Sequence, residues 1–243
     1  MLISRHFLYF ISLGLFWGLS PSFYKHLADI KMPASHTIFI TGLGVGVAML
    51  AIAAAKSGRW SVDWPTIRYG AICAFLMNMP FGLNLVLAGH VPPTELAIII
   101  TTAPFFNYSL ALLTGWESAA PRRLLAITAG FLSTLVLILS RDGMLAGDAS
   151  WWLIASLSIP LLYCAYNTYA AQAWPANADT LRVGAAESIW SGLLVIPVIL
   201  LAAPFGAPDG PTFSGYWILG LAILMWIVER IAYFTLIRDK DAV

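Results

Sequence analysis

Charged side chains are scarce in this sequence. Asp, Glu, Lys and Arg make up 10% of its 243 residues, whereas a soluble domain carries about 25%. Apolar residues account for 60% of the chain and the mean hydropathy is +0.81, so the chain cannot cover a surface that faces water. The shortage of charge excludes a nucleic-acid-binding protein, a cytosolic dinucleotide-binding enzyme and a disordered regulator. The composition predicts an all-α membrane protein whose surroundings are a lipid bilayer.

The sequence also has few groups that could catalyse a reaction. Its two cysteines, Cys73 and Cys164, lie apart in apolar stretches, so they indicate neither a disulfide framework nor a metal site. The four histidines are scattered and no H-E-x-x-H segment is present, which argues against a metalloprotease. The chain contains no G-x-x-x-x-G-K-[ST], the phosphate loop of nucleotide-driven pumps. We therefore expect no enzyme activity, no metal and no cofactor.

Long apolar runs are what the sequence has in abundance. A helix rises 1.5 Å per residue, so about 20 apolar residues cross a hydrocarbon core of about 30 Å. Charged residues, Gly/Pro turns or polar clusters separate the runs. The sequence predicts about eight transmembrane helices, over residues 7–27, 36–55, 69–89, 94–115, 124–140, 150–173, 183–203 and 215–237.

Lys and Arg are distributed unequally over the expected loops. The first apolar run is too long for a signal peptide, and no small-x-small cleavage site follows it before Lys25, so we expect it to remain as a span. With the N-terminus in the cytoplasm, ten of the 13 Lys and Arg residues lie on the cytoplasmic side, and Lys25, Lys31 and Arg141 lie opposite. This positive-inside bias predicts a multi-pass protein of the cell (inner) membrane with both chain ends in the cytoplasm.

The first and sixth expected spans share a short pattern. When residues 16–24 are placed against residues 162–170, Trp17 corresponds to Tyr163 and Phe23 to Tyr169. The sixth span enters from the opposite side to the first, so the second copy would be inverted, as in many transporters. We expect an inverted five-helix repeat, with residues 1–140 as the first copy and residues 141–243 as a second, incomplete copy of three helices.

Several short motifs occur in a recognisable order. They are Phe16-Trp17-Gly18 with Lys25, Pro104 within residues 99–105, Gly115-Trp116-Glu117, Gly130, and residues 163–169. This set resembles the drug/metabolite transporter superfamily, in particular its EamA-type members. The resemblance implies ten helices in two inverted repeats and export or exchange of amino acids, nucleotide-like compounds or drugs. Because nothing here corresponds to the last two helices, a truncated or partner-dependent protein without transport activity of its own is the alternative.

Polar residues inside a membrane are costly and need a reason. Trp17, Ser20 and Tyr24 follow each other at i, i+3 and i+7, which places them on one helix face. This face could form the wall of a substrate cavity, or it could pack against another helix with the help of the small residues Gly14 and Gly18. The other candidates for substrate contact are Asn78, Thr101, Pro104, Tyr108, Tyr163 and Asn167.

Three charged residues fall within the last two expected spans. Glu187 and Arg230 should lie at similar depth, so we expect Arg230 to pair with Glu187, or Glu229 to pair with a neighbour. A structural ion pair is one interpretation, and binding of a proton or of a substrate ammonium is the other. Together these features predict a secondary transporter that exports small metabolites by alternating access, and a homo-oligomer is compatible with the sequence.

Overall fold

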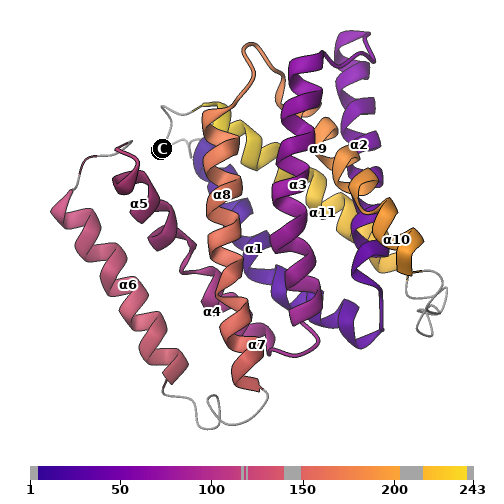
Figure 1. Ribbon diagram of the computed structural model, residues 1–243. Coiled ribbons are helices and arrows are strands. Elements are labelled where there is room, and N and C mark those ends of the chain that lie inside the picture. Colours follow the sequence, from indigo (N-terminus) through magenta and orange to yellow (C-terminus); the bar gives the residue numbers. More distant parts are fainter. Residues whose placement is uncertain (1–4, 116–117, 119, 140–148, 203–215, 240–243) are drawn as a thin grey trace.

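The computed structural model describes residues 5–115, 118, 120–139, 149–202 and 216–239, and these residues form helices and their connections. Helices occupy all eight ranges that the sequence marks as apolar, and three of those ranges contain two helices each (Figure 1). The helices are α1 (Arg5–Asp29), α2 (Ala34–Ser57), α3 (Trp64–Leu87), α4 (Pro93–Ile100), α5 (Ala103–Leu113), α6 (Pro121–Leu139), α7 (Ala149–Ser156), α8 (Ser158–Gln172), α9 (Thr180–Leu194), α10 (Ile196–Ala202) and α11 (Trp217–Arg238).

Six segments of the described chain are long and apolar enough to cross a membrane. They are α1 from His6, α2, α3, α4 with α5, α9 with α10 to Leu201, and α11. Large apolar side chains point outward from the bundle, among them Leu113, Leu125 and Leu201, which are 86%, 74% and 73% exposed. Exposing such an apolar surface to water would be unfavourable in free energy, whereas lipid tails solvate it. The chain is a multi-pass membrane protein, and the regular secondary structure of its described residues is helical.

Exposed tryptophans gather near the two ends of the bundle. Trp60 and Trp64 lie at the connection between α2 and α3, while Trp151 and Trp217 lie at the beginnings of α7 and α11. Tryptophan favours the level of the lipid headgroups, because its ring is apolar and its N–H needs a polar partner. This placement is typical of the two interfacial belts of a membrane protein.

Proline interrupts three segments that the sequence predicts as continuous helices. The chain breaks between α4 and α5, between α7 and α8, and between α9 and α10. Pro104, Pro160 and Pro197 follow the three breaks closely. Each proline lacks the N–H that would bond to the carbonyl four residues earlier, so the helix cannot continue unchanged.

Hydroxyl groups satisfy backbone carbonyls at two of these breaks. At the first, Thr101 and Thr102 donate to the carbonyls of Ile98 and Ile99 at 2.5 and 2.7 Å. At the second, Ser156 Oγ donates to the carbonyl of Leu153 at 2.6 Å. A membrane core offers no water to backbone groups, so these hydroxyls add hydrogen bonds to carbonyls beside the interruptions.

Glycines bring α2 and α3 close to α9. A Cβ atom on Gly42 would lie 2.7 Å from the backbone nitrogen of Gly192, and one on Gly70 would lie 2.8 Å from that of Glu187. These distances leave no room for a side chain, and a Cβ atom on Gly46 would lie 2.8 Å from the backbone nitrogen of Ile189, so α2 packs closely on α9 at Gly46 as well. The tight α2–α9 and α3–α9 contacts form the centre of the bundle.

Two neighbouring pairs of helices in the bundle are antiparallel. Trp17 and Phe23 of α1 meet Glu229 and Trp226 of α11, so α1 and α11 are antiparallel. Helices α3 and α8 are antiparallel too, because Tyr69 hydrogen-bonds to Ala170 and Asn84 to Tyr163. Helix α5 packs on the other side of α8, and α6 packs outside α5 (Figure 1). The space enclosed by α1, α5, α8 and α11 holds the candidate site.

Candidate functional site

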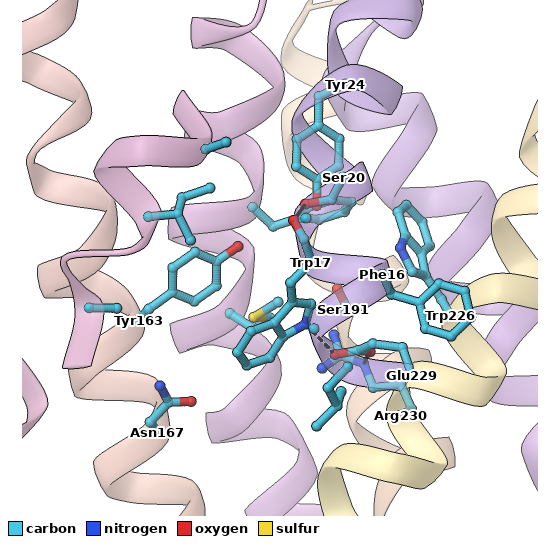
Figure 2. Close-up of a pocket in the computed structure, with 18 of the residues that line it drawn as sticks. Phe16, Trp17, Ser20, Tyr24, Tyr163, Asn167, Ser191, Trp226, Glu229 and Arg230 are labelled. Carbon is cyan, nitrogen blue, oxygen red and sulfur yellow. Dashed lines mark hydrogen bonds and ion pairs between the residues drawn. The ribbon is translucent and has the colours of Figure 1, made fainter. Parts of the chain in front are cut away.

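A cavity of about 640 Å³ lies at mid-depth in the bundle. It reaches α1, α2, α3, α4, α5, α8, α9 and α11, and Trp17, the central residue of α1, lies on its wall. In Figure 2, side chains from α1, α8 and α11 point into this common space. A pocket of this volume can hold a drug-sized or smaller solute.

Most of the residues that the sequence nominated for substrate contact line this cavity. Thr101 and Pro104 contribute from the break between α4 and α5, so the interrupted helix forms part of the wall. Helices α1 and α8, which contain the pattern shared by residues 16–24 and 162–170, both contribute to the wall. Trp17 and Tyr163 therefore face the same cavity (Figure 2). The nominated residues that line it are Trp17, Ser20, Tyr24, Thr101, Pro104, Tyr163 and Asn167.

Two nominated residues lie elsewhere. The amide of Asn78 faces α9, where its Nδ2 donates to the carbonyl of Ser191 at 2.9 Å and its Oδ1 accepts from the Ser191 hydroxyl. Tyr108 is buried, and its hydroxyl accepts from the backbone N–H of Ala120 at 3.0 Å. Neither residue lines the cavity, whereas Asn107, the neighbour of Tyr108, does. Spacing along a helix gives relative angles but not the direction in which a face points.

Arg230 lies between two buried carboxylates. Its Nη1 is 3.5 Å from Glu187 Oε1, and its Nε is 3.7 Å from Glu229 Oε2. Glu187 is fully buried behind the guanidinium, while Glu229 and Arg230 both line the cavity. The sequence predicts that Glu187 and Arg230 lie at similar depth and can pair, and the structure shows this contact between α9 and α11. Trp17 completes the group, because its indole nitrogen donates to Glu229 Oε1 at 3.0 Å (Figure 2).

Tyrosines connect this charged group to α8. Arg230 Nη1 donates to the Tyr166 hydroxyl at 3.3 Å, and the Tyr166 ring stacks on Tyr233 with centroids 5.6 Å apart. The Tyr233 hydroxyl in turn donates to Asn167 Oδ1 at 2.7 Å. Ion pairs and hydrogen bonds therefore connect α1, α8, α9 and α11 around the cavity.

Four aromatic rings, which we name the aromatic cluster, pack together beside the cavity, and Tyr24, Phe81 and Trp226 also line it. They are Phe23 and Tyr24 of α1, Phe81 of α3 and Trp226 of α11. Each ring contacts two others, with centroid separations from 5.1 Å for Phe81–Trp226 to 6.3 Å for Phe23–Tyr24. Tyr24 and Phe81 belong to the buried apolar core that continues from there to Met32 in the turn between α1 and α2.

Sequence reasoning missed the hydroxyl groups on α2 and α9. Thr41, Ser188 and Ser191 line the cavity, and the i, i+3 spacing of the two serines is a signal that could have nominated them. Among the described residues, no group of three or more His, Cys, Asp or Glu side chains could hold a metal ion. The wall of the cavity is thus mainly aromatic and aliphatic, with hydroxyls, amides and one charged group.

The comparisons with known proteins agree with this architecture at the level of the family. No curated protein and no solved structure matches the chain significantly. Residues 5–139 match the EamA-like transporter family. This match covers more than half of the sequence and includes α1 to α6, and the chain therefore belongs to the EamA-like transporter family.

Proposed function

We propose that this chain is a secondary transporter that exports small metabolites by alternating access, and that the mid-depth cavity is its substrate site. The observation that carries the proposal is the cavity itself, which lies among interrupted helices near the middle of the bundle. Carriers of this kind place their sites at the midplane, where broken helices expose backbone and polar groups. The family assignment also favours a carrier over an intramembrane enzyme.

The pattern of helix contacts supports an inverted repeat with residues 1–140 as one copy and residues 141–243 as the other. In this repeat, α1, α2 and α3 of the first copy correspond to α8, α9 and α11 of the second copy. Exchanging each helix for its counterpart turns the contact between α1 and α11 into the contact between α8 and α3. The same exchange turns α3–α9 into α11–α2, and α1–α3 into α8–α11, and all of these pairs are in contact. The antiparallel α2–α9 pair, in which Gly42 meets Gly192 and Gly46 meets Ile189, lies where a pseudo-two-fold axis would pass.

The repeat requires eight crossings, so α6 and the α7–α8 segment would also span the membrane. Both are helical over most of the expected ranges. With eight crossings, the excess of Lys and Arg supports a cytoplasmic location for both chain ends in the cell (inner) membrane. The aromatic cluster would then lie toward the non-cytoplasmic end of the cavity.

Counterflow in lipid vesicles tests the proposal. The purified protein is reconstituted into vesicles loaded with phenylalanine, leucine or trimethylphenethylammonium, and uptake of the same labelled compound is followed. We expect counterflow of at least one of the three probes. The Gly18→Trp variant should lose it, because Gly18 lines the cavity and nothing lies within 4 Å of the position of its Cβ.

Gly220→Trp is the matched control. Gly220 lies on α11 away from the cavity lining, and nothing lies within 4 Å of its Cβ position either. This variant should transport like the unmodified protein. Equal counterflow by Gly18→Trp and Gly220→Trp would contradict the assignment of the cavity, and a folded protein that moves none of the three probes would contradict the transport function.

A further inference from the structure

The charges at the cavity do not balance. Two carboxylates, Glu187 and Glu229, share the single guanidinium of Arg230. Among the residues that line the cavity in the described part of the chain, Arg230 is the one cation. When both carboxylates are ionised, the group carries a net charge of −1. Such a charge in a water-poor environment attracts a cation strongly.

The carboxylate on the cavity wall is Glu229. Glu187 is fully buried behind Arg230 and does not line the cavity. Glu229 lies on the wall, and its Oε1 atom is held by the indole N–H of Trp17 at 3.0 Å. A solute in the cavity can therefore approach Glu229 but not Glu187. The contact with Trp17 fixes the orientation of the Glu229 carboxylate, so less freedom is lost when a ligand binds.

Aromatic rings surround the approach to Glu229. Phe16, Trp17 and Trp226 line the same cavity from α1 and α11 (Figure 2). The electron-rich faces of such rings attract ammonium groups, and they also pack against an apolar body. A carboxylate next to aromatic faces is a combination that recognises organic cations.

Arg230 is less suited to bind an anion. Its guanidinium already faces Glu187 at 3.5 Å, Glu229 at 3.7 Å and the Tyr166 hydroxyl at 3.3 Å. An anion placed against Arg230 would meet the field of both carboxylates and would compete with them for the same donors. The arrangement thus disfavours a negatively charged solute at this point.

We propose that the cavity selects organic monocations with an aromatic or apolar body, and that Glu229 is the residue that contacts the cationic group. This inference rests on the proposed function, since it names the class of substrate for the same cavity. The hydroxyls of Ser20, Ser188 and Ser191 supply further hydrogen-bonding groups on the cavity wall.

Three ligands of similar size and different charge test the inference. Phenethylammonium, phenethyl alcohol and phenylacetate are titrated into the purified, detergent-solubilised protein at neutral pH, and heat of binding is measured. We expect phenethylammonium to bind about tenfold or more tightly than the alcohol, as one charge-assisted contact allows. Phenylacetate should bind most weakly. This comparison uses the unmodified protein and does not depend on any variant folding.

A variant then assigns the contact to Glu229. Glu229→Gln should weaken phenethylammonium binding by about tenfold or more, and it should change phenethyl alcohol binding by less than about twofold. Asp29→Asn is the control, because Asp29 is an exposed carboxylate on α1 that pairs with Lys25 at 2.8 Å, and its binding constants should not change. Thermal melting confirms that both variants are folded.

The outcomes separate this inference from the proposed function. Binding of the alcohol or of phenylacetate as tightly as phenethylammonium, or absence of binding by all three, would overturn the inference. Unchanged phenethylammonium binding in a folded Glu229→Gln variant would overturn it too. If the cation binds selectively but no counterflow occurs, the inference stands and the transport function fails. If phenylalanine counterflow persists without any preference for cations, the transport function stands and the inference fails.

Discussion

At the scale of single residues, Arg230 holds the buried part of the bundle together. Its guanidinium lies between the carboxylates of Glu187 on α9 and Glu229 on α11, and it also donates to Tyr166 on α8. Removing one partner of a buried pair leaves a charge without compensation, which costs more than the pair itself contributes. The stability of three helices is therefore coupled through this side chain.

Arg230→Met should lower the free energy of unfolding by about 3 kcal/mol or more, because Glu187 would remain fully buried without its cation. Unfolding by SDS titration in mixed micelles measures the change. The double variant Arg230→Met with Glu187→Leu should recover part of the loss, since it removes the fully buried carboxylate, while Glu229 on the cavity wall still lacks its cation. A single variant as stable as the unmodified protein, or a double variant less stable than the single one, would contradict this account.

Asp63 gives a pH-dependent contribution outside the membrane spans. Its side chain caps α3, accepting from the Thr66 hydroxyl at 2.8 Å and from the Thr66 backbone N–H at 3.4 Å. The hydrogen bond from the Thr66 side chain is the main reason that the pKa of Asp63 lies below its ordinary value. The stabilisation is therefore present above the ordinary carboxyl pKa of about 3.9, and it is lost as the pH falls through the lowered value of the folded state.

We expect Asp63→Ala to cost about 1 kcal/mol at neutral pH. The difference from the unmodified protein should disappear in strong acid, where the carboxyl group is protonated. Thermal unfolding in detergent as a function of pH measures both effects. Asp63→Asn is the control, because an amide also caps a helix but does not titrate. A destabilisation by Asp63→Ala that is the same at every pH would rule out the carboxylate as its cause.

At the scale of helices, the sequence predicts positions well and interruptions less well. Apolar runs locate the eight ranges in which the described chain is helical, and six segments of it are long and apolar enough to cross a bilayer. The breaks near Pro104, Pro160 and Pro197 were not predicted, since proline in a membrane helix can either kink or interrupt it, depending on what satisfies the freed carbonyls. At the first break the hydroxyls of Thr101 and Thr102 donate to the neighbouring carbonyls of Ile98 and Ile99.

The direction in which a helix face points was also only partly predictable. Trp17, Ser20 and Tyr24 share a face that does line the cavity, whereas Asn78 turns to α9 and Tyr108 to Ala120. Periodicity relates residues of one helix to each other, but neighbouring helices decide which face meets the cavity. The glycines of α2 allow its close approach to α9, and the structure shows which helix they meet.

Gly42→Ala tests the close packing of α2 against α9. The added Cβ would lie 2.7 Å from the backbone nitrogen of Gly192 and 2.8 Å from the carbonyl oxygen of Ser188, and backbone atoms cannot yield without moving a helix. We expect a loss of about 1–3 kcal/mol in the free energy of unfolding, measured by SDS titration. Gly220→Ala adds the same atom in open space on α11 and should be neutral or stabilising. Equal effects of the two variants would refute the packing argument.

At the scale of the whole molecule, the account depends on two groups of helices that cross the membrane in opposite directions around one cavity. The exchange symmetry of the helix contacts supports this arrangement, and the sequence suggested it only through the short pattern around Trp17 and Tyr163. Such weak similarity is expected, because lipid-facing positions need only be apolar and constrain sequence little. In the proposed inverted repeat, both copies contribute to the cavity that we propose as the substrate site.

Sided labelling of two engineered cysteines tests the inversion most directly. Trp60 and Trp151 are 65% and 67% exposed, and α3, the α4–α5 segment and α6 lie between them. Three crossings should place them on opposite sides, so a membrane-impermeant maleimide should reach Trp151→Cys in intact cells and Trp60→Cys only in inverted vesicles. The native protein, whose Cys73 and Cys164 are buried, gives the background. Labelling of both positions from the same side would contradict the inverted repeat and the cavity shared between its halves.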